Sequence, residues 1–169
     1  MFTTKRRRDE EFSLFAASAT PSLTGTAWLL TSDRDAASEL VQAALVKTYV
    51  AWPRVRAGEA LAYTRRALIN HHIDTWRKDA RLVHDDTPEL KPDPRSPEGD
   101  VDTRDAVVRM LATLPPQQRT IIVLTYLEDM SEADVAAHLK ITPGAVKSAK
   151  SRGLATLRAS YAPAEGNPS

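Results

Sequence analysis

The stretch SEADVAAHLKITPGAVKSAKSRGLATLRASY, residues 131–161, decides the fold of the carboxy-terminal third of the chain. Ser131 is a good helix N-cap, and Asp134 follows it in the first turn of the expected helix. Thr142 and Pro143 mark a second helix start, because proline suits the first helical position. Two helices with a short connection have the proportions of a helix-turn-helix.

The second of these helices places different side chains on its two faces, because residues one turn apart share a face. One face is mostly apolar or small: Val146, Lys150, Gly153, Leu154 and Leu157. The other carries cations, hydroxyls and a small residue: Lys147, Ser148, Ser151, Arg152 and Ala155. Such a face suits phosphates and base edges in the major groove of DNA. From charge alone, a merely solvated face is the alternative.

An acidic, proline-rich segment divides the 169-residue chain. The net charge of +1 hides a distribution of +4 over residues 1–78, −5 over 79–102 and +2 over 103–169. The middle segment has too few large apolar residues to offset its ordering entropy, so we interpret 79–102 as a flexible linker. The predicted domains are therefore residues 9–78 and 103–161, with a frayed tail over 163–169.

Both domains are predicted to be all-α. Apolar residues at helical spacing indicate helices over residues 12–30, 36–51 and 59–78, and Pro21 is expected to kink or restart the first. After the linker, a helix over 105–114 ends at Pro115-Pro116, which opens the next. The basic residues Arg6-Arg7-Arg8 are interpreted as a solvated tail.

The composition restricts the class of protein. The chain has no cysteine, which excludes disulfides and thiolate metal sites, and no apolar run approaches the roughly 20 residues of a membrane span. The basic start lacks the apolar stretch of a secretion signal. We therefore expect a cytoplasmic protein without cofactor or metal.

Motifs in both halves resemble one family. Residues 114–158, with Leu-Pro-Pro-Gln-Gln-Arg at 114–119 and Gly-Ala-Val-Lys-Ser at 144–148, resemble region 4 of extracytoplasmic-function RNA polymerase sigma factors (group IV of the sigma-70 family). Glu-Leu-Val-Gln at 39–42 and Asn-His-His-Ile-Asp-Thr-Trp-Arg at 70–77 resemble region 2. The resemblance covers about 85% of the chain, in the right domain order.

The resemblance implies a factor that binds RNA polymerase core and directs transcription initiation at promoter DNA. Docking on the clamp helices of the largest polymerase subunit is implied for Glu39, Leu40, Gln42 and Lys47. Contacts with the −10 element are implied for Arg54, Arg56, Tyr63, Arg66, Asn70, Trp76 and Arg77, although Tyr63 and Trp76 are equally compatible with a core position. Contacts with the −35 element are implied for Lys147, Ser148, Ser151 and Arg152. An anti-sigma factor is a further expected partner.

Three positions depart from the family pattern. Glu39 stands where aspartate is common, which keeps the charge. Lys140 stands in the turn where glycine is common, so a left-handed backbone there is expected to cost about 1 kcal/mol. Ala149 replaces a frequent basic residue, which is expected to reduce phosphate contacts.

Two other classes of function compete with this interpretation. A helix-turn-helix regulator that acts without polymerase core would have a sensory or dimerising amino-terminal domain in place of the region 2 motifs. An enzyme is disfavoured, because His71, His72 and Asp74 lack further ligands and no phosphate loop or nucleophile signature is present.

Overall fold

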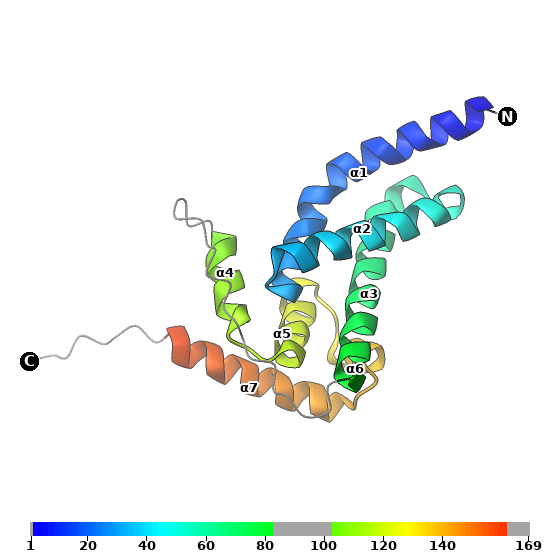
Figure 1. Cartoon of the computed structure of the whole chain (residues 1–169). Helices are drawn as coiled ribbons and strands as arrows, with labels where there is room; N and C mark the ends of the chain where they lie inside the picture. The colour runs from blue at the N-terminus through cyan, green and yellow to red at the C-terminus, as the bar shows by residue number, and fades with distance from the viewer. Residues whose placement is uncertain (1, 83–102, 162–169) are drawn as a thin grey trace, which may run out of the picture. The chain divides into compact units, whose positions relative to one another are not determined.

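The computed structural model describes residues 2–82 and 103–161, which form two compact units (Figure 1). The first unit contains α1 (Phe2–Thr31), α2 (Arg34–Ala51), the 3₁₀ turns η1 (Trp52–Arg54) and η2 (Ala57–Glu59), and α3 (Ala60–Leu82). The second unit contains α4 (Thr103–Ala112), α5 (Pro116–Ile122), the π-helical turn η3 (Val123–Leu127), α6 (Glu132–Leu139) and α7 (Pro143–Tyr161). The regular structure of the described residues is helical throughout, which confirms the all-α prediction.

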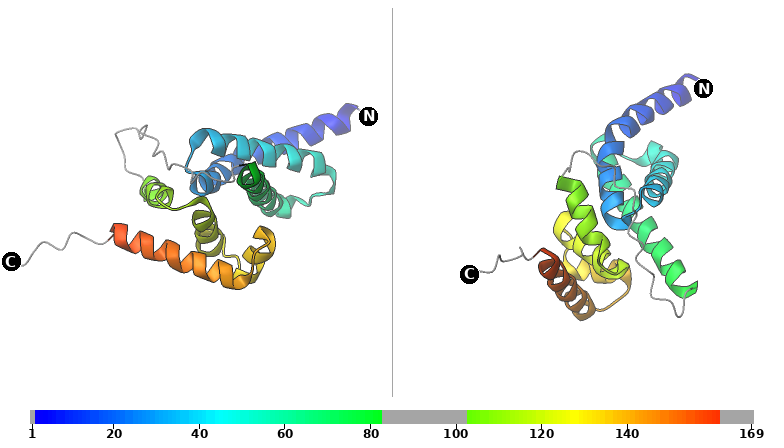
Figure 2. Two further views of the ribbon diagram at one scale, coloured as in Figure 1. Left: turned by 60° about the horizontal axis from the view of Figure 1, so that its bottom comes forward. Right: turned by 60° about the vertical axis from the view of Figure 1, so that its left-hand side comes forward.

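Helix α1 is longer than the sequence pattern predicted. It continues through Pro21 to Thr31, and Figure 2 shows the ribbon changing direction part-way along it, so the proline bends the helix without restarting it. Beyond the bend, Leu23, Ala27 and Leu30 are fully buried, which offsets the lost backbone hydrogen bond. The expected basic tail is also helical.

The first unit is a three-helix arrangement in which α2 packs on both α1 and α3. Helix α2 begins two residues earlier than predicted, because the Asp33 carboxylate accepts hydrogen bonds from the backbone N–H groups of residues 35 and 36. Between α2 and α3, the buried hydroxyl oxygens of Thr48 and Thr64 lie 2.9 Å apart. Helix α3 runs to Leu82, four residues beyond the predicted domain boundary; the rest of the expected linker and the expected frayed tail lie outside the described residues.

The second unit is organised around the turn from α4 to α5. The Arg119 side chain is 6% exposed and donates hydrogen bonds to the carbonyl oxygens of Leu111 and Leu114, both at 3.1 Å. The Leu111 carbonyl belongs to the last turn of α4, where intrahelical donors run out, and the Leu114 carbonyl lies two residues beyond the end of that helix. A buried charged side chain therefore completes the helix end and holds the two helices together.

Helix α7 crosses α5 closely at a glycine. A Cβ atom at Gly153 would lie 2.5 Å from the Ile122 Cδ1 atom, well inside van der Waals contact. The backbone of α7 can approach α5 this closely only because residue 153 has no side chain. Because Gly153 faces α5, the opposite face of α7 is exposed to solvent.

Candidate nucleic-acid interface

The outer face of α7 carries the four residues predicted to contact the −35 element. Lys147, Ser148, Ser151 and Arg152 are all exposed. Between them, Val146, Ala149 and Gly153 are buried against the rest of the second unit. The predicted division of the helix into two faces is therefore present in the structure. One expectation is wrong: Ala149 is only 2% exposed, so this position faces the core and has no part in phosphate contacts.

Both helices of the helix-turn-helix have a side-chain cap at their amino-terminal end. The Ser131 hydroxyl accepts the backbone N–H of Asp134 at 3.1 Å, and the Thr142 hydroxyl accepts that of Ala145 at 3.1 Å. Lys140, directly after α6, has φ 54° and ψ 45°, a left-handed conformation that glycine adopts at less cost. These local features determine the angle between the axes of α6 and α7 (Figure 1).

Lys150 has a different role from the other cations of α7. Its ammonium forms an ion pair with Glu132 at the start of α6 and lies 5.7 Å from the centre of the Tyr126 ring. The hydrogen bond from Lys150 lowers the pKa of the Glu132 carboxyl, and the same bond raises the pKa of Lys150. Lys150 therefore joins α6 to α7.

Glu132→Gln is expected to remove a pH-dependent part of the stability of the second unit. A carboxyl with a lowered pKa contributes stability above its usual value of 4.5 and loses it as the pH falls through the folded value. An ammonium with a raised pKa contributes below its usual value of 10.5 and loses it as the pH rises through the folded value. Wild type should therefore melt at a higher temperature than the variant at neutral pH, with the difference shrinking well below pH 4.5 and above pH 10.5.

Thermal denaturation followed by circular dichroism across this pH range measures the difference. Glu10→Gln is the matched control, because Glu10 forms an ion pair with Arg6 one turn away on the exposed surface of α1. Such pairs contribute little, so the control should melt like wild type. A difference between wild type and Glu132→Gln that does not change with pH would contradict the role of the ion pair.

The turn between α2 and α3 carries two of the residues predicted to contact the −10 element. Arg54 and Arg56 are exposed, on η1 and immediately before η2. Neither 3₁₀ turn has a side-chain cap. The turn thus presents two guanidinium groups to a nucleic-acid backbone, with little internal bonding to hold them in place.

Helix α3 brings together four of its five predicted −10 residues. At about 100° per residue, Tyr63, Arg66, Asn70 and Arg77 fall within one narrow stripe along the helix. Arg66 is exposed and the other three are half-buried, so all have some accessible surface. Trp76 is also half-buried but lies about 100° around the helix from Arg77, which separates it from this stripe.

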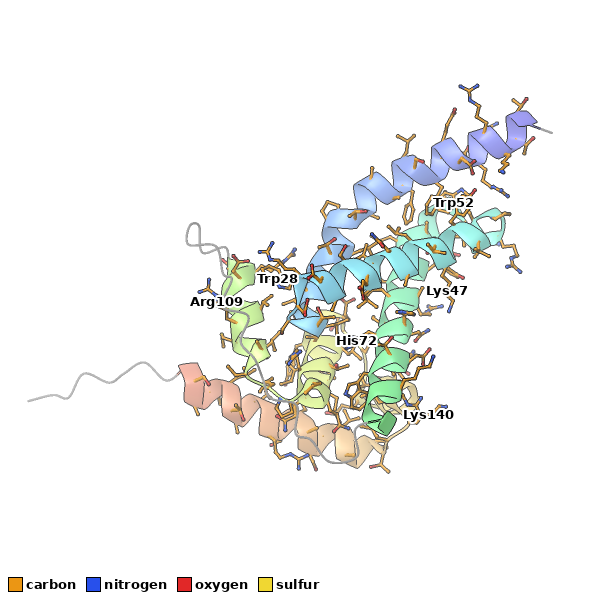
Figure 3. All side chains as sticks on the ribbon, viewed as in Figure 1. Trp28, Lys47, Trp52, His72, Arg109 and Lys140 are labelled. Atoms are coloured by element: carbon orange, nitrogen blue, oxygen red, sulfur yellow. The ribbon has the colours of Figure 1, made fainter. Side chains whose placement is uncertain are left out.

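Helix α2 exposes an apolar pair that the sequence reasoning missed. Glu39, Gln42 and Lys47 are exposed as predicted, and Lys47 projects from the side of α2 in Figure 3. Val46 and Val50, one turn apart, are 64% and 69% exposed in the same region. Their spacing from Glu39 and Gln42 was the available signal, because residues 39, 42, 46 and 50 follow helical periodicity.

The prediction that Leu40 belongs to the docking surface is wrong. It is 5% exposed and belongs to the core of the first unit, together with Val41 and Ala44 on the same helix. Apolar residues at these positions hold α2 against its neighbours. Leu40 therefore positions α2, and Val46 and Val50 replace it on the exposed surface.

Two other kinds of site, a metal centre and a membrane-spanning helix, are absent from residues 2–82 and 103–161. No group of three or more His, Asp or Glu side chains in these ranges is arranged to hold a metal ion. The same ranges contain no helix that is both long enough and apolar enough to cross a membrane.

The chain is similar in sequence to known proteins over both of its units. Residues 104–157 match the model of the family Sigma-70, region 4. The chain is 35% identical to the RNA polymerase sigma-E factors of Streptomyces avermitilis, over 88% of this chain and 83% of the relative, and Streptomyces coelicolor, over 88% and 84%. The chain belongs to the extracytoplasmic-function sigma factors of the sigma-70 family. It is therefore an RNA polymerase sigma factor.

The solved structures extend the similarity across both units of the sigma factor. The sigma factor RpoE from Bartonella quintana, crystallised in complex with the anti-sigma factor NepR, has a TM-score of 0.56 and 25% identity to it. The match covers 89% of this chain and 96% of that chain. Coverage this broad reaches well beyond region 4, so the sigma factor assignment holds over a regulator that shares only the helix-turn-helix.

Proposed function

We propose that the sigma factor divides promoter recognition between its two units. Lys147, Ser148, Ser151 and Arg152 on α7 read the −35 element in the major groove. The separation of the faces of α7, with these four residues outside and Val146 and Gly153 inside, is the observation that carries this proposal. Exposed cations and hydroxyls on a helix whose amino-terminal end is capped by Thr142 satisfy the requirements of major-groove recognition.

The first unit engages the −10 element. Arg54 and Arg56 on the turn contact the phosphate backbone, and the stripe on α3 contacts the opened strand. An extruded base needs a ring for stacking, and stacking is worth about 1–3 kcal/mol per base. Half-buried Tyr63, on the same stripe as Arg66 and Asn70, is the ring that the geometry favours over Trp76.

Helix α2 docks on polymerase core through Glu39, Gln42, Lys47, Val46 and Val50. A surface that mixes exposed apolar and polar side chains along one helix fits the clamp helices of the largest subunit. The sigma factor would act in the cytoplasm, where RNA polymerase works. Because the structural relative RpoE is bound by an anti-sigma factor, we also propose an anti-sigma partner here.

The first experiment is gel filtration of the purified protein with bacterial core polymerase that lacks a sigma factor. Co-elution without DNA, followed by permanganate-detected opening of a promoter, is the expected result. Failure to co-elute with an active core would overturn the docking assignment.

Val50→Glu is expected to weaken core binding at least tenfold. Val50 is 69% exposed, so the fold tolerates the change, but docking would bury an unpaired carboxylate and lose an apolar contact. Leu14→Glu is the matched control, because Leu14 is an apolar residue of the same unit that is 74% exposed, on α1. Fluorescence anisotropy of labelled protein titrated with core measures both. Equal affinities for the two variants would contradict the placement of the docking surface on α2.

A further inference from the structure

A cluster of four rings joins the amino-terminal part of α1 to the end of α2. The aromatic cluster consists of Phe12, Phe15, Tyr49 and Trp52. The centre of the Trp52 ring lies 5.2 Å from the ring centres of both Phe12 and Phe15, and the Tyr49 ring lies 5.1 Å from Phe12. All four side chains are half-buried. Aromatic pairs at these separations are stabilised beyond the area they bury.

Polar contacts extend the attachment toward the start of α1. The Tyr49 hydroxyl donates a hydrogen bond of 2.6 Å to the Asp9 carboxylate. The Arg8 guanidinium lies 5.8 Å from the centre of the Tyr49 ring, within cation–π range. Residues 8–15 of α1 therefore pack against the carboxy-terminal end of α2 through ring contacts, a hydrogen bond and a cation–π contact.

Trp52, which contacts α1 through the aromatic cluster, is also the first residue of the turn that carries Arg54 and Arg56. The Trp52 carbonyl closes η1 by accepting the backbone N–H of Val55 at 3.2 Å. Pro53 then fixes one backbone angle directly before Arg54. Figure 3 shows Trp52 where α2 ends beside α1. The start of the turn is thus set by side chains about 40 positions earlier in the sequence.

We propose that the amino-terminal part of α1 is a positioning element for promoter opening. Through the aromatic cluster it holds Trp52, and through Trp52 it holds the turn from residue 53 to 59 in the geometry that the opened −10 strand requires. The inference rests on the proposed −10 role of Arg54 and Arg56. A turn with no side-chain cap of its own needs such an external anchor, because loosely held groups lose most of their advantage in recognition.

The test separates the opening step from the binding steps. Phe12→Leu and Phe15→Leu remove a ring but keep an apolar side chain. We expect each to slow the isomerisation from closed to open promoter complex by about tenfold, with core affinity and closed-complex affinity within about twofold of wild type. Phe15→Tyr keeps the ring and should open promoters at the wild-type rate. Stopped-flow fluorescence of 2-aminopurine in the −10 element reports the opening rate.

Leu14→Ala is the control for changes in α1 that do not touch the aromatic cluster, since Leu14 is 74% exposed. Its opening rate should equal that of wild type. Circular dichroism of each variant confirms that the helices are intact. Phe12→Leu and Phe15→Leu proteins that open promoters at the wild-type rate would overturn the proposal, as would equal losses in core binding, closed-complex affinity and opening.

The double variant Arg54→Ala, Arg56→Ala distinguishes failure of this inference from failure of the proposed function. If the double variant opens promoters normally, the turn does not contact the −10 element as proposed. The inference about α1, which rests on that contact, is then wrong as well. If the double variant slows opening but the two leucine variants do not, the assignment stands and the positioning role of α1 is wrong.

Discussion

Arg119→Ala is expected to destabilise the second unit by about 3 kcal/mol. The guanidinium is buried, and burial lowers its pKa, yet arginine keeps its charge at neutral pH. Its hydrogen bonds to the Leu111 and Leu114 carbonyl oxygens are therefore charge-assisted, and each is worth about 1.5–3 kcal/mol. Alanine would remove both and leave a cavity between α4 and α5.

Hydrogen–deuterium exchange of the full chain localises this effect. Amides of α4 and α5 should lose protection in the variant, while those of α1, α2 and α3 keep theirs, because the two units are compact on their own. Arg119→Lys should fall in between, since lysine keeps the charge but lacks the planar fork. Arg158→Ala, an exposed change on α7, should leave exchange unaltered. Unchanged protection of α4 in Arg119→Ala would show that these hydrogen bonds contribute little.

The sequence predicted best those features that depend on near neighbours in the chain. The caps at Ser131 and Thr142 each use a side chain that accepts a backbone N–H three residues on. The faces of α7 follow from helical periodicity alone. The left-handed backbone at Lys140 was suggested only by the family resemblance, in which glycine is common at this place in the turn.

Features that depend on distant parts of the chain were predicted poorly. The sequence left open whether Pro21 kinks α1 or restarts it, and burial of Leu23 and its neighbours, which outweighs the local penalty, decides for a kink. Helical periodicity separates Leu40 from Val46 on α2, but which of the two faces is buried depends on the packing of α2 against α1 and α3. The aromatic cluster joins residues 12 and 52, a contact that no spacing rule connects.

Arg152→Ala is expected to weaken binding to the −35 element by about 1–3 kcal/mol, a loss of about 5- to 150-fold. Arg152 is exposed one turn beyond Ser148 on the outer face of α7. Within residues 2–82 and 103–161 its guanidinium forms no ion pair, in contrast to the Lys150 ammonium, which is paired with Glu132. Binding to DNA therefore requires no internal contact of Arg152 to be broken first. A bidentate contact with a guanine edge would give the upper part of the expected range.

Three variants separate base recognition from charge. Arg158→Ala removes the same charge from the exposed surface of the same helix, and a small, sequence-independent loss is expected. Arg152→Lys keeps the charge, so it should preserve the salt dependence of binding while losing discrimination between the −35 element and a mutated one. Anisotropy with short duplexes, selected from fragments that the holoenzyme binds, measures affinity and discrimination together. If Arg152→Ala lowers affinity for both duplexes equally, Arg152 contacts phosphate; if it lowers neither, α7 reads the −35 element without it.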